Sequence, residues 1–261
     1  MSYITDFKSA PFNLFGVKGG VTSNDASLAT LVGSRFSSGN REFVLIQNGG
    51  TALVAGNLIQ GPVSIGANHT GLAVAAASAI GATTITVTMG GTLCTANQYQ
   101  GGYAVISAGT GIGQTLKIAS HPAGTSSGSV VLTLEDPLSV AIDIATSKVS
   151  LTLNPHGSQY GTTFATSGCV VCPTTLTGPV LGVTITPIPA TTATVLSYGF
   201  IQTKGAVACL NDAGTAIGLD LMPSSNTAGA VMTYVVATKS RVGTSTVAGE
   251  TTKAQIINIQ L

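Results

Sequence analysis

The stretch that decides the fold lies between positions 82 and 138. It reads ATTITVTMGG (82–91), GGYAVIS (101–107), GQTLKIASHPAG (113–124) and GSVVLTLEDPL (128–138). Threonines alternate with Ile85 and Val87, so one face of a strand is polar and the other apolar. Residues 130–135 repeat this alternation. Because glycines bound these β-branched runs, we expect antiparallel strands joined by short loops, forming a central β module over residues 72–155.

Short apolar runs continue to the end of the chain. They cover residues 180–185, 193–203, 206–210, 216–221, 231–237 and 255–261, with clusters of turn residues between them. This spacing is typical of a small barrel or sandwich, which we place at residues 179–261. A Gly/Thr-rich connector at 156–178 separates it from the central module. The predicted fold class is therefore all-β, with two small antiparallel β-barrel or sandwich modules and an extended N-terminal arm.

The first region, residues 1–71, is predicted to hold the arm and a β-hairpin. Four aromatic side chains, Tyr3, Phe7, Phe12 and Phe15, lie close to the start of the chain. They indicate either an arm that docks on a partner or a terminal strand that completes its own domain, and both alternatives stay open. The four aromatic residues are the candidate partner contacts.

Two local patterns follow the arm. A strand at 41–46, the sequence Asn48-Gly49-Gly50 and a second strand at 51–54 predict a hairpin, since Asn-Gly between apolar runs favours a tight turn. The alanine-rich residues Leu72–Ala79 are the one segment that could form a short helix. The alternative is that they lead directly into a strand.

The composition is that of an assembly subunit. Charged residues make up 7% of the chain, against ~25% in typical soluble domains, and the formal net charge is +1. The basic residues are scattered, whereas binding to nucleic acid needs clustered Lys and Arg, so we expect no nucleic-acid partner. A surface with so little charge favours association, which suits a protein covered by its neighbours.

The mean hydropathy of +0.46 raises the question of a membrane. The most apolar run, Leu72–Ala82, is about half the ~20 residues that a spanning helix needs. Asp6 and Lys8 interrupt the first residues, which therefore do not resemble a secretory leader. We expect a soluble product made in the cytoplasm, with no membrane partner.

Cysteine offers the first candidate site. Cys169-Val-Val-Cys172 has the C-x-x-C spacing of zinc and redox sites, but a structural zinc needs two more ligands. Valines separate the two cysteines, and positions three apart on a strand face opposite sides. We therefore interpret both as buried small hydrophobic residues and predict no metal site.

Other motifs are incomplete. GTGIG at 109–113 lacks the Lys-Ser or Lys-Thr of a phosphate loop, so a hairpin loop is expected. Gly124-Thr-Ser126-Ser-Gly128 matches the nucleophile elbow, but no helix is expected after it. Glu135-Asp136 and Asp212 read as turn residues. The N-x-T sequence at Asn68 matches the N-glycosylation motif, which predicts no glycosylation without a secretory leader. The sequence predicts no catalytic residue and no cofactor, and hence no enzyme.

Several segments resemble known proteins. Residues 84–88, 94–103, 113–122 and 130–138 resemble virion structural proteins of tailed bacteriophages. Residues 179–183, 198–205 and 218–224, followed by Gly229-Ala-Val231, look like the small barrel of phage capsid decoration (cement) proteins. The resemblance covers roughly residues 82–261. In that family a turn-rich barrel sits on the outside of the head, commonly as a homotrimer.

The resemblance implies a structural function. We expect a virion protein on the outer surface of the head, which bridges subunits of the major capsid protein and contacts neighbouring copies of itself. The alternative is a head or tail fibre, or an adhesin module, that binds host-surface glycans. A phage-borne hydrolase that uses Ser126 is a third class, which measurable hydrolysis abolished by Ser126→Ala would support.

Overall fold

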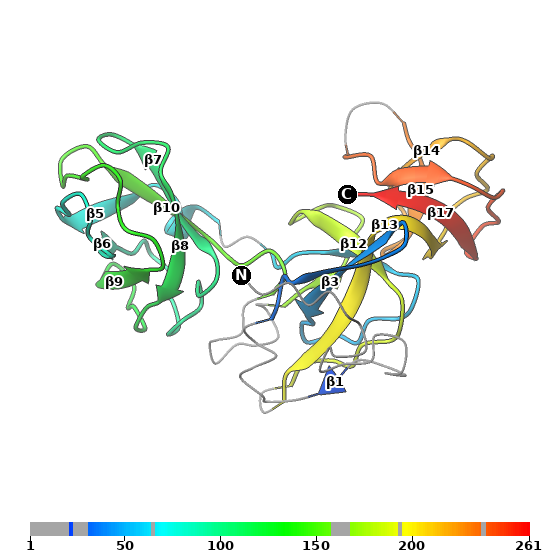
Figure 1. The fold of residues 1–261 in the computed structure, drawn as a ribbon, viewed down its shortest axis with the longest axis horizontal. Helices are drawn as coiled ribbons and strands as arrows, with labels where there is room; N and C mark the ends of the chain where they lie inside the picture. The colour runs from blue at the N-terminus through cyan, green and yellow to red at the C-terminus, as the bar shows by residue number, and fades with distance from the viewer. Residues whose placement is uncertain (1–20, 23–30, 64–65, 158–167, 193–194, 236–238) are drawn as a thin grey trace. The chain divides into compact units, whose positions relative to one another are not determined.

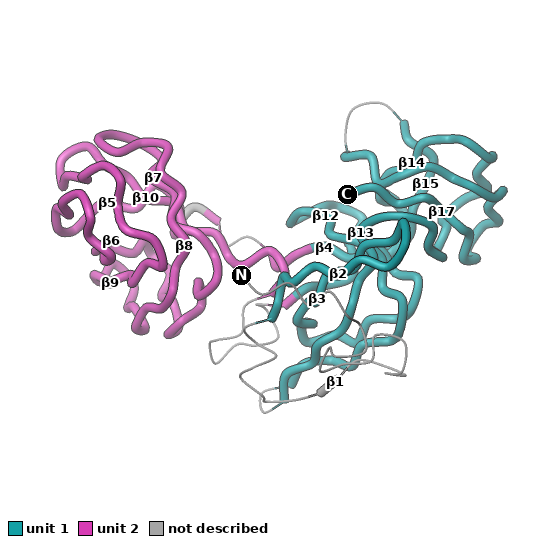
Figure 2. Tube along the Cα trace, in the orientation of Figure 1, with its two compact units in different colours: residues 1–60, 169–261 teal, residues 61–168 magenta. Residues whose placement is uncertain are grey.

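The chain folds into two compact β units, which Figure 2 colours separately. The computed structural model describes residues 21–22, 31–63, 66–157, 168–192, 195–235 and 239–261. Unit 1 comprises residues 1–60 and 169–261, and unit 2 comprises residues 61–168. Unit 2 is thus inserted into unit 1. The prediction of an all-β chain with two β modules is confirmed, whereas the expected N-terminal arm lies outside the described residues.

Unit 2 is a closed antiparallel barrel of six strands (Figure 1). The 3-10 helix η1 (Ala67–His69) precedes it. The strands are β5 (Leu72–Ala76), β6 (Thr84–Thr88), β7 (Tyr103–Ala108), β8 (Thr115–Ser120), β9 (Ser129–Leu134) and β10 (Lys148–Thr152). They pair in the order β10-β5-β6-β9-β8-β7, and β10 closes the ring by pairing with β7. The strands predicted from alternation at 84–88 and 130–135 are confirmed.

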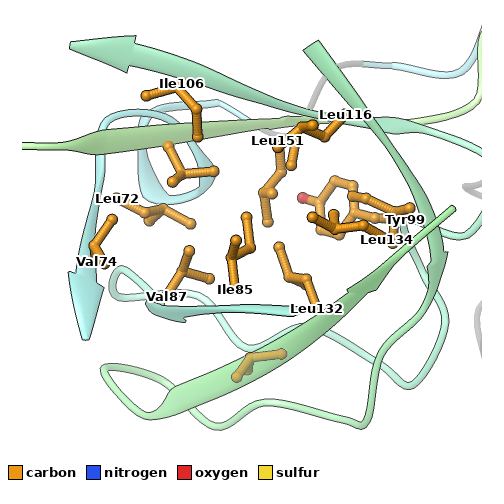
Figure 3. Close-up of a cluster of buried hydrophobic side chains, with 14 of the residues drawn as sticks. Leu72, Val74, Ile85, Val87, Tyr99, Ile106, Leu116, Leu132, Leu134 and Leu151 are labelled. Carbon is orange, nitrogen blue, oxygen red and sulfur yellow. The ribbon is translucent and has the colours of Figure 1, made fainter. Parts of the chain in front are cut away.

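The barrel encloses one apolar core, which Figure 3 shows. Ile85 and Val87 of β6 are fully buried, while the threonines between them face outward. Leu132 of β9 lies opposite Ile85 in the strand pairing, so that the two side chains meet inside. The period of two in the sequence therefore sorts each strand into an inner and an outer face.

Unit 1 is built on a single sheet of eleven strands. Its first strands are β1 (Val21–Thr22), β2 (Arg35–Ser38), β3 (Arg41–Gln47) and β4 (Leu58–Gln60), all before the barrel. After the barrel come β11 (Val170–Val171), β12 (Val180–Thr184), β13 (Ser197–Leu210), β14 (Asp220–Pro223), β15 (Val231–Thr233), β16 (Gly243–Ser245) and β17 (Ala254–Gln260). The main path runs β11-β4-β12-β13-β17-β16-β14-β15.

The central element of unit 1 is β13, a strand of 14 residues (Figure 1). It pairs with β1, β3, β12 and β17. The register against β3 shifts between Gln202 and Lys204. Just beyond, Gly205 has a φ of +89°, a conformation that side chains rarely adopt. The runs 193–203 and 206–210, expected to be separate strands, are therefore joined within one bent strand from Ser197 onward.

The insertion of the barrel begins and ends at neighbouring strands of unit 1. Residue Gln60, the last of β4, lies opposite Val170 of β11 in an antiparallel pair. The two ends of the inserted segment therefore meet within unit 1. The predicted boundaries after residues 71, 155 and 178 differ from this division, because β3 and β4 pair with strands more than a hundred residues later and no local pattern reveals such pairing.

The predicted hairpin at Asn48-Gly49-Gly50 is wrong. Strand β3 pairs with β2 and β13, and residues 51–54 contribute only an isolated bridge from Leu53 to Ile188. Asn48 is fully buried, and its Nδ2 donates to the carbonyl oxygens of Thr51 (2.9 Å) and Pro189 (2.6 Å). The Asn48 side chain thus holds the segment after β3 against the residues around Pro189, and no tight hairpin turn forms here.

Within the segment Leu72–Ala79, residues Leu72–Ala76 form strand β5, and the segment contains no helix. Leu72 and Val74 of β5 are buried and the residues between them are more exposed, so the alternative of a strand lead-in is confirmed. In the part of the chain that the structure describes, no helix has the length and apolar character to cross a membrane.

Candidate functional site

The two cysteines of the C-x-x-C motif point into different cores. Cys169 packs with the cluster around Ile46 and Ile201, whereas Cys172 packs with the cluster around Val183 and Ile257. Both are buried and neither forms a disulfide, so the predicted burial is confirmed. Burial raises the pKa of the Cys169 thiol and raises that of Cys172 to about 11. Both thiols are therefore protonated and unreactive near neutral pH.

The glycine-rich motifs close loops of the barrel. Residues 109–113 connect β7 and β8 as a hairpin, as expected. The loop at 124–128 leads directly into strand β9, and the Ser126 hydroxyl donates to the carbonyl oxygen of Gly91 (3.1 Å). The strand, turn and helix of a nucleophile elbow are therefore not formed here.

The acidic residues hold local structure. Glu135 forms an ion pair with Lys117 across 2.8 Å. Asp212 accepts hydrogen bonds from Ser224 Oγ (2.8 Å) and Thr227 Oγ1 (2.6 Å), so it fixes the loop that follows β14. Hydrogen bonds, that from Thr227 above all, lower the pKa of Asp212. Among the described residues, no three His, Cys, Asp or Glu side chains gather in a metal-binding group.

The barrel contains a buried chain of polar groups that no pattern in the sequence predicts. His69, Tyr99 and His121 are almost fully buried. The Tyr99 backbone N–H donates to His121 Nε2 (3.0 Å), and the His121 Nδ1–H donates to the carbonyl oxygen of Pro122 (2.8 Å). The Tyr99 hydroxyl contacts His69 Nδ1, and His69 Nε2 lies 3.1 Å from the carbonyl oxygen of Thr92.

These contacts fix the position of one ring proton on each histidine. A backbone N–H can only donate and a carbonyl oxygen can only accept, so His121 is neutral with its proton on Nδ1. At His69 the carbonyl oxygen of Thr92 can only accept, which places a proton on Nε2, whereas the Tyr99 hydroxyl can act as donor or acceptor toward Nδ1. Burial lowers the pKa of His121 and raises that of Tyr99. Each of these three side chains already has a hydrogen-bond partner. The buried polar chain therefore ties loops to the core, and none of its three members is a free base.

Unit 1 carries a surface groove of about 330 Å³. Alanines of β13 and β17, Thr184 and the buried Gln202 line it, and Arg41 is the one charged residue among the lining residues. The guanidinium carbon of Arg41 lies 5.1 Å from the centre of the Phe43 ring. The groove contains no nucleophile beside a base, so its lining offers contact surface and no catalytic set.

The four aromatic residues proposed as partner contacts, Tyr3, Phe7, Phe12 and Phe15, lie outside the described residues. The structure therefore does not place them relative to the groove or to the buried polar chain. No protein family, curated protein or solved structure was found to match the chain.

Proposed function

We propose that this protein is a structural component of a tailed-phage virion that decorates and cements the outer surface of the capsid. In this function it bridges subunits of the major capsid protein and associates with copies of itself, as a trimer. The proposal rests on the sequence resemblance to phage decoration proteins. The structural observation that supports it best is the number of large apolar side chains exposed on a chain with very little charge.

One such group lies on unit 1. Ile217, Leu219, Val247 and Ile256 are exposed, and backbone hydrogen bonds hold their segments together: Ser245 N donates to the carbonyl of Leu219 (2.9 Å), and Thr246 N to that of Ile256 (3.2 Å). Contiguous exposed apolar groups mark surfaces that a partner covers.

Cementing requires buried surface and no chemistry. A standard interface buries about 800 Å² on each partner, and each Å² of apolar surface removed from water contributes about 25 cal/mol before entropic costs. Two β units on one chain provide two such surfaces. Each contact with a capsid subunit is modest, but it is repeated at every equivalent position of the symmetric shell. Together these contacts oppose the separation of the capsid subunits.

The test is the position and copy number of the protein in the particle. Quantitative mass spectrometry of purified virions, combined with a cryo-electron microscopy reconstruction, gives both. We expect on the order of hundreds of copies at the radius of the outer shell surface, in trimers. A handful of copies at a vertex or on the tail would contradict decoration and favour the fibre or adhesin alternative.

A further inference from the structure

The two ends of the barrel differ in the loops and chain connections that lie there. The chain enters before β5 and leaves after β10 at one end, where the loops 89–102 and 121–128 also lie. The strands are antiparallel, so the loops β5–β6 (77–83), β7–β8 (109–114) and β9–β10 (135–147) all lie at the opposite end. We call this the distal end. Neither of the two connections to unit 1 leaves the barrel at this end.

Exposed aliphatic side chains gather at the distal end. Ile80 is 69% exposed, Ile112 65%, Ile144 58% and Val140 46%. They come from all three distal loops. Such large apolar side chains are the kind that a protein partner removes from water, and their burial is what drives association.

Hydrogen bonds hold these loops in a fixed arrangement. Gln114 Nε2 donates to the carbonyl oxygens of Gly111 (3.1 Å) and Val140 (3.0 Å), and Gln114 Oε1 accepts from Ser139 N (2.9 Å) and Val140 N (3.0 Å). The third loop joins through reciprocal backbone bonds between Ser78 and Ile142. A surface held in this way loses little conformational entropy when it binds.

The distal loops carry more negative than positive charge. They contain Glu135, Asp136 and Asp143 and no Lys or Arg, and Lys148 follows the third loop as the first residue of β10. Lys117 of β8 pairs with Glu135, which leaves two aspartates against the single Lys148, a net negative charge beside the aliphatic side chains. Hydrogen bonds from the side chains of Thr110 and Thr146 lower the pKa of Asp143 to about 2, so that it is ionised at neutral pH.

We propose that the distal end of the barrel is a docking surface for an apolar protein patch bordered by Lys or Arg. The inference rests on the proposed function, in which the partner is the outer surface of the major capsid protein. Charge complementarity favours this occupant over the others. Two distal ends of separate copies would bring their aspartates together, and an anionic lipid surface would repel them.

The test uses particles assembled without this protein, to which purified full-length protein is added back. The variant is Ile80→Ser combined with Ile112→Ser and Ile144→Ser; all three side chains are exposed, so the barrel core keeps its packing. Co-sedimentation measures bound copies against added protein. We expect the half-saturating concentration to rise at least about tenfold, because the central apolar contacts of an interface dominate its affinity.

The matched control replaces three exposed apolar residues elsewhere on unit 2, with Leu93→Ser, Tyr103→Ser and Val131→Ser. This control should bind like the wild type. Asp136→Lys should slow association and reduce its dependence on salt, since rim charges act mainly on the association rate. Circular dichroism melts check that each variant is folded.

The outcomes separate the two proposals. If the wild type binds and the distal variant binds equally well, the docking surface is wrong while decoration stands. If the wild type does not bind the particles, decoration fails and the docking proposal fails with it. If the distal variant loses only self-association, measured by light scattering, the surface is an interface between copies and the proposed partner is wrong.

Discussion

His121 shows how a single buried residue couples the barrel to pH. Its two ring nitrogens are both used in the neutral state, one as acceptor from Tyr99 N and one as donor to Pro122 O. A second proton on Nε2 would face the Tyr99 N–H, so that two donors meet. The folded pKa is therefore lowered from the ordinary value of 6.5, with burial as the largest cause and the nearby His69 as a lesser one.

We expect unit 2 to lose stability as the pH falls below about 6.5. In that range His121 binds a proton in the unfolded state but stays neutral in the folded state, so the free energy of unfolding rises with pH. The contribution of neutral His121 to the free energy of unfolding is fully present above the pKa that this residue has in the unfolded state. At about pH 5.5 the loss is at most about 1.4 kcal/mol, the value for one pH unit below that pKa. Thermal melts at about pH 7.5 and pH 5.5 measure it.

The control for this effect is His121→Gln, which has no titrating ring. We expect it to be less stable at both pH values and to show a smaller difference between them. The carboxylates with lowered pKa, Asp143 and Asp212, titrate below their ordinary value of 3.8 and stay ionised over this range. An unchanged pH dependence in His121→Gln would show that another group is responsible.

The cysteines provide a second prediction at the residue scale. Cys94, Cys169, Cys172 and Cys209 are all buried free thiols whose pKa is raised by burial. We expect no labelling by a maleimide at about pH 7.5 on the native protein, and four labels after denaturation in guanidinium chloride, counted by intact mass. Rapid labelling of Cys169 or Cys172 in the native state would contradict their placement in two separate cores.

At the scale of elements, β13 depends on a glycine. Gly205 has a φ of +89°, and a Cβ there would lie 2.8 Å from the carbonyl oxygen of Asn40. We expect Gly205→Ala to lower the free energy of unfolding by about 2 kcal/mol or more, from backbone strain and from this steric conflict. Chemical denaturation of the full chain measures the change.

Gly39, in the turn between β2 and β3, is the matched control. Its φ is +62°, but a Cβ there meets nothing within 4 Å. Gly39→Ala should therefore cost only the strain, about 1 kcal/mol. Equal losses in the two variants would mean that the close approach of Asn40 to β13 does not matter.

The strands of the barrel could be predicted because each is half buried and pairs with strands near in sequence. Ile85 and Val87 alternate with threonines, and their partners on β9 lie within the same stretch. In unit 1 the strand expected at 41–46 is confirmed as β3, but its pairing could not be predicted in the same way. β3 is buried on both faces, so it lacks alternation, and its main partner β13 follows only after the inserted barrel.

The buried polar groups were missed for a related reason. His69 and His121 are isolated histidines in the sequence, and only the closure of the barrel brings both beside Tyr99. The cysteines were interpreted correctly, since positions three apart on an extended segment face opposite sides. The candidate aromatic contacts near the N-terminus stay a prediction.

At the scale of the whole molecule, the insertion makes the two units separable. Gln60 and Val170 lie opposite one another, so a short glycine-containing turn can replace residues 61–168. We expect the shortened protein to keep its β-sheet circular dichroism and to unfold cooperatively, because shortening a loop lowers the entropy lost on folding. Residues 61–168 alone should fold as well, because one complete core lies within them.

The outcome that contradicts this prediction is a shortened chain that unfolds without a cooperative transition. The barrel would then be needed for the folding of unit 1. The same measurement on the isolated barrel shows whether the dependence is mutual. If residues 61–168 unfold cooperatively by themselves, only unit 1 depends on the other unit.

The N-terminal residues give the last prediction. Under the proposed function, removing Met1–Gly20, which carries Tyr3, Phe7, Phe12 and Phe15, should weaken attachment to the capsid and leave unit 1 folded. Occupancy on particles assembled without the protein is the measurement, with circular dichroism as the control for folding. Wild-type occupancy by the truncated protein would show that these residues do not act as a docking arm.

The ring closure between β10 and β7 has a consequence for crowding. An open sheet offers unpaired N–H and C=O groups to any strand nearby, and at high local concentration such borders seed amyloid-like growth. The barrel has satisfied these groups within itself. The barrels of neighbouring copies can therefore pack side by side without exchanging backbone hydrogen bonds, and contacts between barrels are left to side chains, whereas the open sheet of unit 1 keeps its edge strands.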